Sequence, residues 1–202
     1  EVLCGARLLY NYVWPGGVSH DFPKGFRKKI TDFLDYFEPQ IDEYNGLLTT
    51  NKIFIERTAD VGIIPVDVAI NFGVSGPNLR ASGLSWDLRK DEPYSAYNDF
   101  DFDVPIGKGD MGSVGDSWDR YWVRVLEITE SVKIIRQAID GMPDGDVNEA
   151  LPKRVRPKVG NVYSRYESSR GDIGFYISSN GKNIPYRLKM RSPAFCSLSA
   201  LA

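Results

Sequence analysis

Large apolar residues recur every three or four positions in the first long stretch of the chain, from residue 24 onward. They are Phe26, Ile30, Phe33, Leu34, Phe37, Ile41, Tyr44 and Leu48. This spacing places them on one buried face of a helix. Pro39 lies inside the stretch, and we expect it to kink the helix without ending it.

A second long stretch begins after Asp116 and Ser117 and gives the clearest helix pattern in the chain. Its apolar residues are Trp118, Trp122, Val125, Ile128, Val132, Ile135 and Ile139. Asp119 makes the first turn acidic, which suits the positive end of the helix dipole. Gly141 is placed to end the helix.

Shorter patterns fill the space around these two helices. One helix is predicted from Thr50 to Asp60, with Asn51 or Thr50 as its N-terminal cap. Another covers residues 66–72, because Pro65 suits a first helical turn and Gly73 a helix end. Residues 2–12 are mostly apolar and compatible with a helix. The Trp-Pro-Gly-Gly segment at 14–17 then forces a turn.

The last third of the chain changes from helical spacing to alternation. Ile173, Phe175 and Ile177 share one face, and Tyr186, Leu188 and Met190 follow after Asn-Gly at 180–181. Alternation around Asn-Gly is typical of a β-hairpin. The predicted fold class is therefore α+β, mainly helical, with a β-hairpin near the C-terminal end. We expect residues 1–150 to form a helical body, and 151–202 a basic linker plus hairpin segment of the same domain.

Composition and charge narrow the possible functions. The 202 residues are 42% apolar and 26% charged, which is ordinary for a globular chain. A net charge of −2 argues against the broad positive face of a nucleic-acid binder. Two cysteines cannot build a disulfide framework, and no apolar run reaches the roughly 20 residues that span a bilayer. Without an initiator Met, a signal pattern or a final helix-ending signal, the sequence reads as a piece of a longer protein.

Several possible sites have simpler interpretations. Asp99, Asp101 and Asp103 alternate with apolar residues and could face a cation, but a half-buried strand with a solvated acidic face is favoured. His20 is interpreted as a surface histidine beside a helix-capping aspartate, Asp21, rather than a proton-handling pair.

Three further motifs also have plain structural interpretations. The glycine-rich segment at 107–115 lacks the order of a phosphate-binding loop and is interpreted as a flexible connector to the helix cap. Cys4 and Cys196 are expected to be buried small hydrophobes, so no metal site is predicted. Arg170-Gly171-Asp172 places a cation at a strand entrance, where glycine allows close approach of the backbone to another group.

The run at 76–105 fits neither a helical nor a strand period. It opens on Gly-Pro and holds arginines, acids and a Pro-Tyr pair. We interpret it as connecting backbone that an ion-pair and hydrogen-bond lattice fixes to the helical body and to partner subunits. The residues of this lattice are Arg80, Asp87, Arg89, Asp91 and Glu92, and the predicted structural anchors are Arg80, Asp87, Arg89 and Arg170.

Four segments together carry a resemblance to a known family. They are the run at 76–105, Gly-Asp-Ser-Trp-Asp-Arg-Tyr at 115–121, Gly-Gly-Val-Ser-His-Asp-Phe-Pro at 16–23, and the hairpin at 168–193. In this order they resemble the D-subunit family of proton-pumping NADH:quinone oxidoreductase, respiratory complex I. The chain is similar to the central part of such a protein. The family is related to nickel–iron hydrogenase large subunits, whose Arg-Gly-acidic motif Arg170-Gly171-Asp172 matches, which implies a hydrogenase-like helical body without the metal.

The resemblance implies a core peripheral-arm subunit of an electron-transport complex, a membrane-associated translocase, on the cytoplasmic side of the inner (plasma) membrane. Implied partners are the protein with the terminal [4Fe-4S] cluster, the C-subunit and the membrane-arm junction subunit, with quinone reduced in a shared cavity. NADH would bind elsewhere, since the chain has no dinucleotide-binding glycine motif. The chain itself is expected to bind no cofactor and to hold no catalytic residue, because the family's quinone-reducing His, Tyr and Asp would precede residue 1.

The sequence departs from the family near the expected position of the partner's cluster. After Arg7, the family often carries a His where this chain has Leu9, and commonly an Arg where it has Trp14. A nearby cation favours the reduced cluster, so we expect a lower, less pH-dependent potential, suited to a low-potential quinone such as menaquinone. The segment at 150–162 also looks shorter than the helical stretch that is usual there.

Two alternatives stay open. One is the large subunit of a membrane-bound, energy-converting nickel–iron hydrogenase, which paired Cys-x-x-Cys segments outside these residues would reveal. The residues from Asp87 to Pro105 favour complex I instead. The other alternative is that the chain, when isolated, is an inactive structural module without NADH or quinone turnover.

Overall fold

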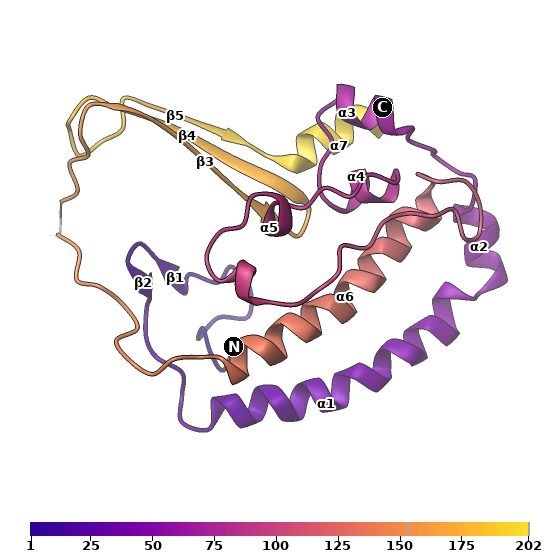
Figure 1. Ribbon diagram of the computed structural model, residues 1–202, viewed down its shortest axis with the longest axis horizontal. Helices are drawn as coiled ribbons and strands as arrows, with labels where there is room; N and C mark the ends of the chain where they lie inside the picture. The colour runs from indigo at the N-terminus through magenta and orange to yellow at the C-terminus, as the bar shows by residue number, and fades with distance from the viewer. Residues whose placement is uncertain (153, 202) are drawn as a thin grey trace.

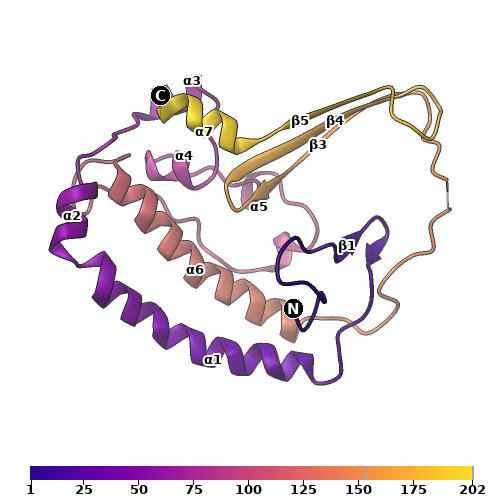
Figure 2. The same ribbon diagram turned by 180° about the vertical axis from the view of Figure 1, so that it is seen from behind.

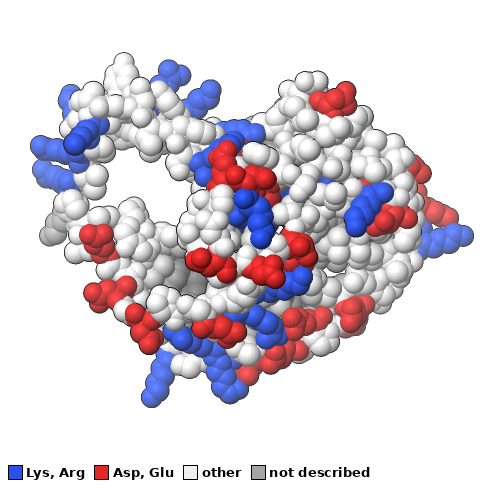
Figure 3. Space-filling model, viewed as in Figure 1, with Lys and Arg blue, Asp and Glu red and all other residues white. Residues whose placement is uncertain are grey.

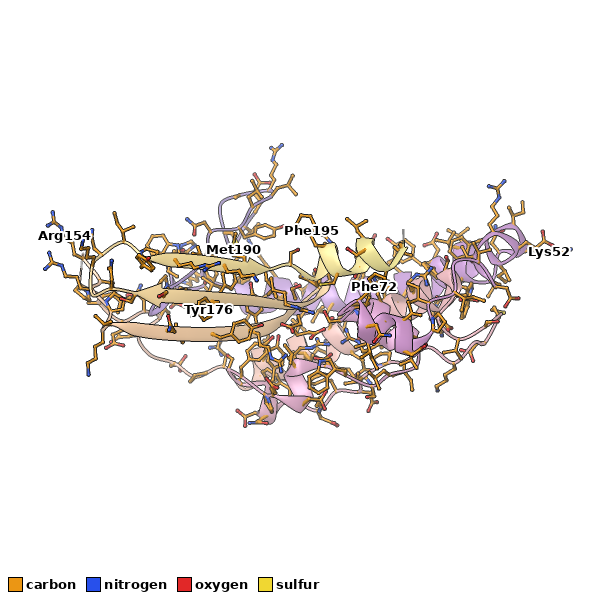
Figure 4. The ribbon with its side chains drawn as sticks, turned by 90° about the horizontal axis from the view of Figure 1, so that it is seen from above. Lys52, Phe72, Arg154, Tyr176, Met190 and Phe195 are labelled. Atoms are coloured by element: carbon orange, nitrogen blue, oxygen red, sulfur yellow. The ribbon has the colours of Figure 1, made fainter. Side chains whose placement is uncertain are left out.

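The computed structural model describes residues 1–152 and 154–201. Two long helices, α1 (Phe26–Tyr44) and α6 (Ser117–Asp140), lie side by side along one edge of the molecule (Figures 1 and 2). A three-stranded sheet lies along the opposite edge and projects from the helical body, as the view from above shows (Figure 4). The short helices between them are α2 (Lys52–Thr58), α3 (Val66–Asn71), α4 (Pro77–Ala81) and α5 (Leu88–Asp91).

Helix α1 confirms the first predicted helix and continues through Pro39. A π-helical segment, η1 (Asn45–Thr49), follows it directly. Only part of its predicted apolar face is buried: Leu34 is 2% exposed, whereas Phe33 and Tyr44 are each 55% exposed. The burial prediction is wrong at those two positions because α1 packs mainly along α6 and has no second neighbouring layer.

The predicted starts of the other helices are confirmed. Asp116 caps α6 through Oδ1, which accepts a hydrogen bond from the Asp119 amide at 2.8 Å. Its Oδ2 accepts from the Asp60 amide at 2.9 Å, so one buried carboxylate fixes both α6 and the turn after α2. Asn51 caps α2 in the same way. Helix α3 follows Pro65 and ends just before the predicted terminator, Gly73.

The glycine-rich segment at 107–115 leads to the α6 cap, as predicted, and it is also closely packed. The buried Asp119 carboxylate accepts a hydrogen bond from the Gly109 amide at 3.0 Å and a longer one from the Gly115 amide. A side chain at Gly107 would lie 2.0 Å from the Ala81 carbonyl oxygen. Burial raises the pKa of Asp119, although the two amides oppose this rise.

The C-terminal sheet is antiparallel, with strand order β3-β4-β5. The strands are β3 (Gly160–Ser168), β4 (Gly171–Ser179) and β5 (Arg187–Arg191). The predicted hairpin corresponds to β4 and β5, and Ile177 lies opposite Leu188, as the alternation requires. The connection is longer than the predicted Asn-Gly turn and runs over 180–186. Strand β3 was not predicted because 160–168 has no regular alternation of apolar residues.

Two predictions of secondary structure are wrong. Residues 2–12 form turns rather than a helix, and a two-residue hairpin, β1 (Val13–Trp14) and β2 (Gly17–Val18), follows around the predicted turn. The acidic segment at 99–103 forms no strand. Its Asp101 and Asp103 amides donate instead to Gln137 and Glu130 of α6 at 2.8 and 2.9 Å, so side chains replace a neighbouring strand. The three aspartates face solvent, as expected.

The run at 76–105 contains helices α4 and α5 and one 3-10 turn, η2 (Tyr97–Asp99), which its irregular sequence did not predict. A further unpredicted helix, α7 (Pro193–Leu201), packs its Ala200 against a small core under α3 and α4. That core consists of Ile64, Ala69, Val74 and Leu79.

Helical residues clearly outnumber strand residues, which confirms a mixed fold richer in helix. The predicted hairpin is part of a three-stranded sheet, and the helical region contains a small hairpin of its own. The assignment of 1–150 and 151–202 to one domain stays a prediction. Among the described residues, no helix combines the length and hydropathy needed to cross a bilayer.

A candidate functional site around a buried arginine

Arg80 on α4 is almost fully enclosed, with 1% of its surface exposed. Its Nε donates to Glu127 of α6 at 2.8 Å, and its Nη1 donates to Glu167 of β3 at 2.9 Å. Nη1 also lies 3.3 Å from Asp87 and donates to the Trp86 carbonyl. One guanidinium thus joins α4, α6, β3 and the segment before α5.

Asp87 is shared between two arginines. It caps α5 by accepting from the Arg89 amide at 2.9 Å, and Arg89 Nη2 donates to its other oxygen at 2.5 Å. Burial favours the neutral acid, but hydrogen bonds from Arg89 and the charge of Arg80 outweigh it and hold the pKa of Asp87 below its ordinary value. The guanidinium of Arg89 also lies 5.1 Å from the ring centre of Phe102, which closes the loop of the run at 76–105.

Glu167 has the opposite tendency. Its side chain is 3% exposed, and burial raises its pKa more than the charge of Arg80 lowers it. The Tyr94 hydroxyl donates to the Glu167 carbonyl at 3.2 Å, and burial raises the pKa of this tyrosine to about 12. The cluster around Arg80 therefore contains carboxyls that respond to pH in different directions.

Arg170-Gly171-Asp172 lies at the tight turn between β3 and β4, and its backbone touches the start of the run at 76–105. A side chain at Gly76 would lie 2.4 Å from the Gly171 Cα, and the Asp172 amide donates to Ser75 Oγ at 3.0 Å. Both glycines have positive φ angles. The predicted close approach of backbone at Gly171 is confirmed.

The two charged residues of this motif have different surroundings. Asp172 is buried and pairs with Arg191 at 3.1 Å and with Arg165 at 3.3 Å. Arg170 lies at the surface, and its guanidinium forms no ion pair within the described part of the chain. Its role as an anchor stays a prediction.

An open cavity of about 580 Å³ lies beside this cluster, between α1, α6 and the β3–β4 turn. One wall is apolar and comes from the two long helices. The opposite wall is polar and includes Arg80, Arg89, Glu127, Glu167, Ser168 and Ser169. Such a cavity suits a group with an apolar body and a polar end. The sequence did not reveal Glu127 and Glu167 as the partners of Arg80, since neither lies near it in the chain.

The residues expected near the partner's iron–sulfur cluster lie in the N-terminal segment. Leu9 is 94% exposed and has a φ angle of +58°, and Trp14 is 51% exposed. Arg7 pairs only with Glu1, at 3.5 Å. Among the described residues, no hydrogen bond or ion pair joins these three side chains to the cluster around Arg80. Their place beside a partner's cluster stays a prediction.

The remaining candidates are simple surface or packing residues. His20 is at the surface, as predicted, but Asp21 accepts from the Phe22 amide and does not cap α1, whose first turn follows Gly25. Cys4 and Cys196 are half-buried rather than buried, and both are free thiols. Within 1–152 and 154–201, no three His, Cys, Asp or Glu side chains are grouped to hold a metal ion.

Replacing Arg80 with methionine should lower the free energy of unfolding by about 3–5 kcal/mol, because three carboxylates would lose a buried counter-ion. Arg136→Met is the matched control. Arg136 also pairs with two carboxylates, Asp35 and Glu38, but at the surface. Its loss should cost about 1 kcal/mol or less. Urea unfolding of the two variants measures the difference, and equal losses would contradict the importance of burial.

Glu167→Gln tests the raised pKa. Between the ordinary value of 4.5 and the higher folded value, the folded chain holds a proton that the unfolded chain releases. Stability should therefore fall as pH rises through this interval, and glutamine should remove that fall. Unfolding midpoints at several pH values between about 5 and 8 provide the measurement. The same pH dependence in both chains would show that Glu167 does not cause it.

Comparison with known proteins agrees with the resemblance seen in the sequence. The family model described as respiratory-chain NADH dehydrogenase, 49 Kd subunit, matches residues 1–159 and 150–202. The D-subunit of NADH-quinone oxidoreductase from Chlorobium luteolum is 53% identical over 205 residues, which cover 100% of this chain and 52% of that protein. The second of the D-subunits named for NADH-quinone oxidoreductase of Anaeromyxobacter dehalogenans is 48% identical over 198 residues, or 98% of this chain and 52% of the relative.

The chain thus spans about half the length of the curated relatives it matches. The two matched stretches of the family model meet in the linker where the sequence departs from the usual pattern. The alignment with the Chlorobium protein is only three positions longer than the chain, so this relative has a similarly short linker. Because the family model matches from end to end, the chain belongs to the family of the 49 kDa subunit of respiratory-chain NADH dehydrogenase.

Proposed function

We propose that the chain is the central part of a core peripheral-arm subunit of proton-pumping NADH:quinone oxidoreductase. The observation that carries this proposal is the end-to-end match to the 49 kDa subunit family. Its relatives are named as subunits of an NADH–quinone oxidoreductase. On this proposal the helical body corresponds to that of a hydrogenase large subunit without its metal, and the protein lies on the cytoplasmic face of the membrane.

The subunit's task is to shape the cavity in which quinone is reduced, beside the terminal [4Fe-4S] cluster of a partner protein. The N-terminal segment is suited to face that partner, because its large apolar side chains have no cover. Leu8 is 78%, Tyr10 64% and Val13 79% exposed. Contiguous exposed apolar side chains of this kind mark protein interfaces. The C-subunit and the membrane-arm junction subunit are the other partners, and NADH binds elsewhere in the complex.

The chain's residues act by positioning and by electrostatics rather than by chemistry of their own. The ion pairs of Arg80 fix the run at 76–105 to α6 and to the sheet. The surface position of Arg170 leaves its charge available to the remainder of the protein. Leu9 and Trp14 give the cluster-facing segment apolar surfaces, which stabilise added negative charge on a neighbouring cluster less well than cations do.

Purification of the assembled enzyme through a tag on the full-length subunit tests the proposed function. The tagged complex should oxidise NADH, reduce quinone and show iron–sulfur signals, while the 202-residue chain alone should show no turnover. A complex that evolves or consumes hydrogen and contains nickel would overturn the proposal in favour of an energy-converting hydrogenase.

The Leu9→His, Trp14→Arg double variant tests the electrostatic part. Histidine tolerates a positive φ angle better than most side chains do, so the backbone at Leu9 should not be strained. The variant should raise the midpoint potential of the terminal cluster and make it depend on pH, because a protonated imidazole favours the reduced form. Redox titration of the assembled enzyme at several pH values is the measurement.

Tyr10→His is the matched control for this titration. It adds the same group one position along the exposed segment. The wild-type enzyme should have a low and nearly pH-independent potential. A high, strongly pH-dependent potential in the wild type, or equal effects of the two histidines, would contradict a specific role of Leu9.

A further inference from the structure

The charge of the chain is divided very unevenly between its two parts. Residues 151–202 contain ten lysines and arginines and two acidic residues, although the whole chain has a net charge of −2. Both of those acids, Glu167 and Asp172, are buried and paired with arginines. The surface charge of the C-terminal segment is therefore entirely cationic, which the net charge of the chain conceals.

These cations gather at the far end of the sheet, away from the helical body. Figure 3 shows Lys and Arg side chains around this end, and Figure 4 labels Arg154 at its extremity. Among the described residues, none of the six cations here pairs with a carboxylate. They are Arg154, Arg156, Lys158, Lys182, Arg187 and Lys189.

The sheet register brings two loops together to make this surface. Gly160 pairs with Ser179, so the linker before β3 and the connection after β4 leave the sheet at the same end. Ser179 Oγ donates to the Pro157 carbonyl at 3.1 Å, which ties the two loops to each other. We call this end of the sheet, residues 154–159 and 180–189, the basic tip.

Exposed apolar side chains alternate with the cations of the basic tip. Val155 is 55%, Val159 77%, Ile184 70% and Tyr186 76% exposed. They are not the edge of a larger apolar core, since the tip projects from the body (Figure 1). An acidic protein surface would need only the cations, whereas the boundary of a bilayer accepts cations at its phosphates and small apolar or tyrosine side chains just below them.

We propose that the basic tip binds the surface of an anionic lipid bilayer. Its cations contact lipid phosphates, and Val155, Val159, Ile184 and Tyr186 enter the boundary between head groups and acyl chains. This binding goes beyond the proposed role in quinone reduction and needs no other protein. A failure of either proposal can therefore be distinguished from a failure of the other.

Sedimentation of the 202-residue chain with vesicles tests the inference. The chain should bind vesicles of phosphatidylcholine that contain about one third phosphatidylglycerol, and should bind pure phosphatidylcholine vesicles at least about tenfold more weakly. Binding should weaken as salt is raised from about 0.1 to 0.5 M, because the charges become screened. Equal binding to both kinds of vesicle, or binding to neither, would overturn the proposal.

Two double variants locate the surface. Arg154→Glu with Arg156→Glu should weaken binding about tenfold or more, since each cation near an anionic bilayer contributes about a fivefold change. Ile184→Asn with Tyr186→Asn should weaken binding while leaving its salt dependence in place.

The matched control reverses two exposed cations of the acidic body, Lys24→Glu with Lys29→Glu. It should leave vesicle binding unchanged, and circular dichroism should show that all three variants fold. A control that loses binding as strongly as the tip variants would overturn the proposal. So would tip variants that bind vesicles normally but lose an acidic partner from the assembled enzyme.

Discussion

A guanidinium taken out of water must be surrounded by acceptors, and at Arg80 this requirement determines how distant parts of the chain meet. Its acceptors are carboxylates from α6, from β3 and from the cap of α5. Each is buried or half-buried, so none can be lost without leaving a charge unpaired in a poorly solvated place. The irregular run at 76–105 acquires a fixed shape from these contacts rather than from any local preference.

Local signals sufficed wherever the chain's own neighbours decide the structure. The caps at Asn51 and Asp116, the helix end before Gly73 and the alternation in β4 and β5 all depend on residues within one or two turns. Prediction failed where distant groups decide. Residues 2–12 have apolar side chains but nothing to pack against, and the acidic segment at 99–103 pairs its amides with side chains of α6.

The candidate site shows the same division. The sequence indicated that Arg80, Asp87 and Arg89 carry structural charge, because arginines and acids recur in a run without any period. It could not indicate Glu127 or Glu167, since 47 and 87 residues separate them from Arg80. Net charge was similarly incomplete as a guide. An acidic body and a basic sheet nearly cancel in the total, although in space they form two separate surfaces (Figure 3).

The contacts of Arg80 and Gly76 with the sheet also bear on how the protein is made. Glu167 follows Arg80 by 87 residues, and Gly171 lies further on still. At a synthesis rate of about 5–20 residues per second, the first half of the body waits roughly 4 to 17 seconds on the ribosome before its partners emerge. During that wait the segment around Arg80 cannot close, so the nascent chain offers chaperones a long-lived and charged opening.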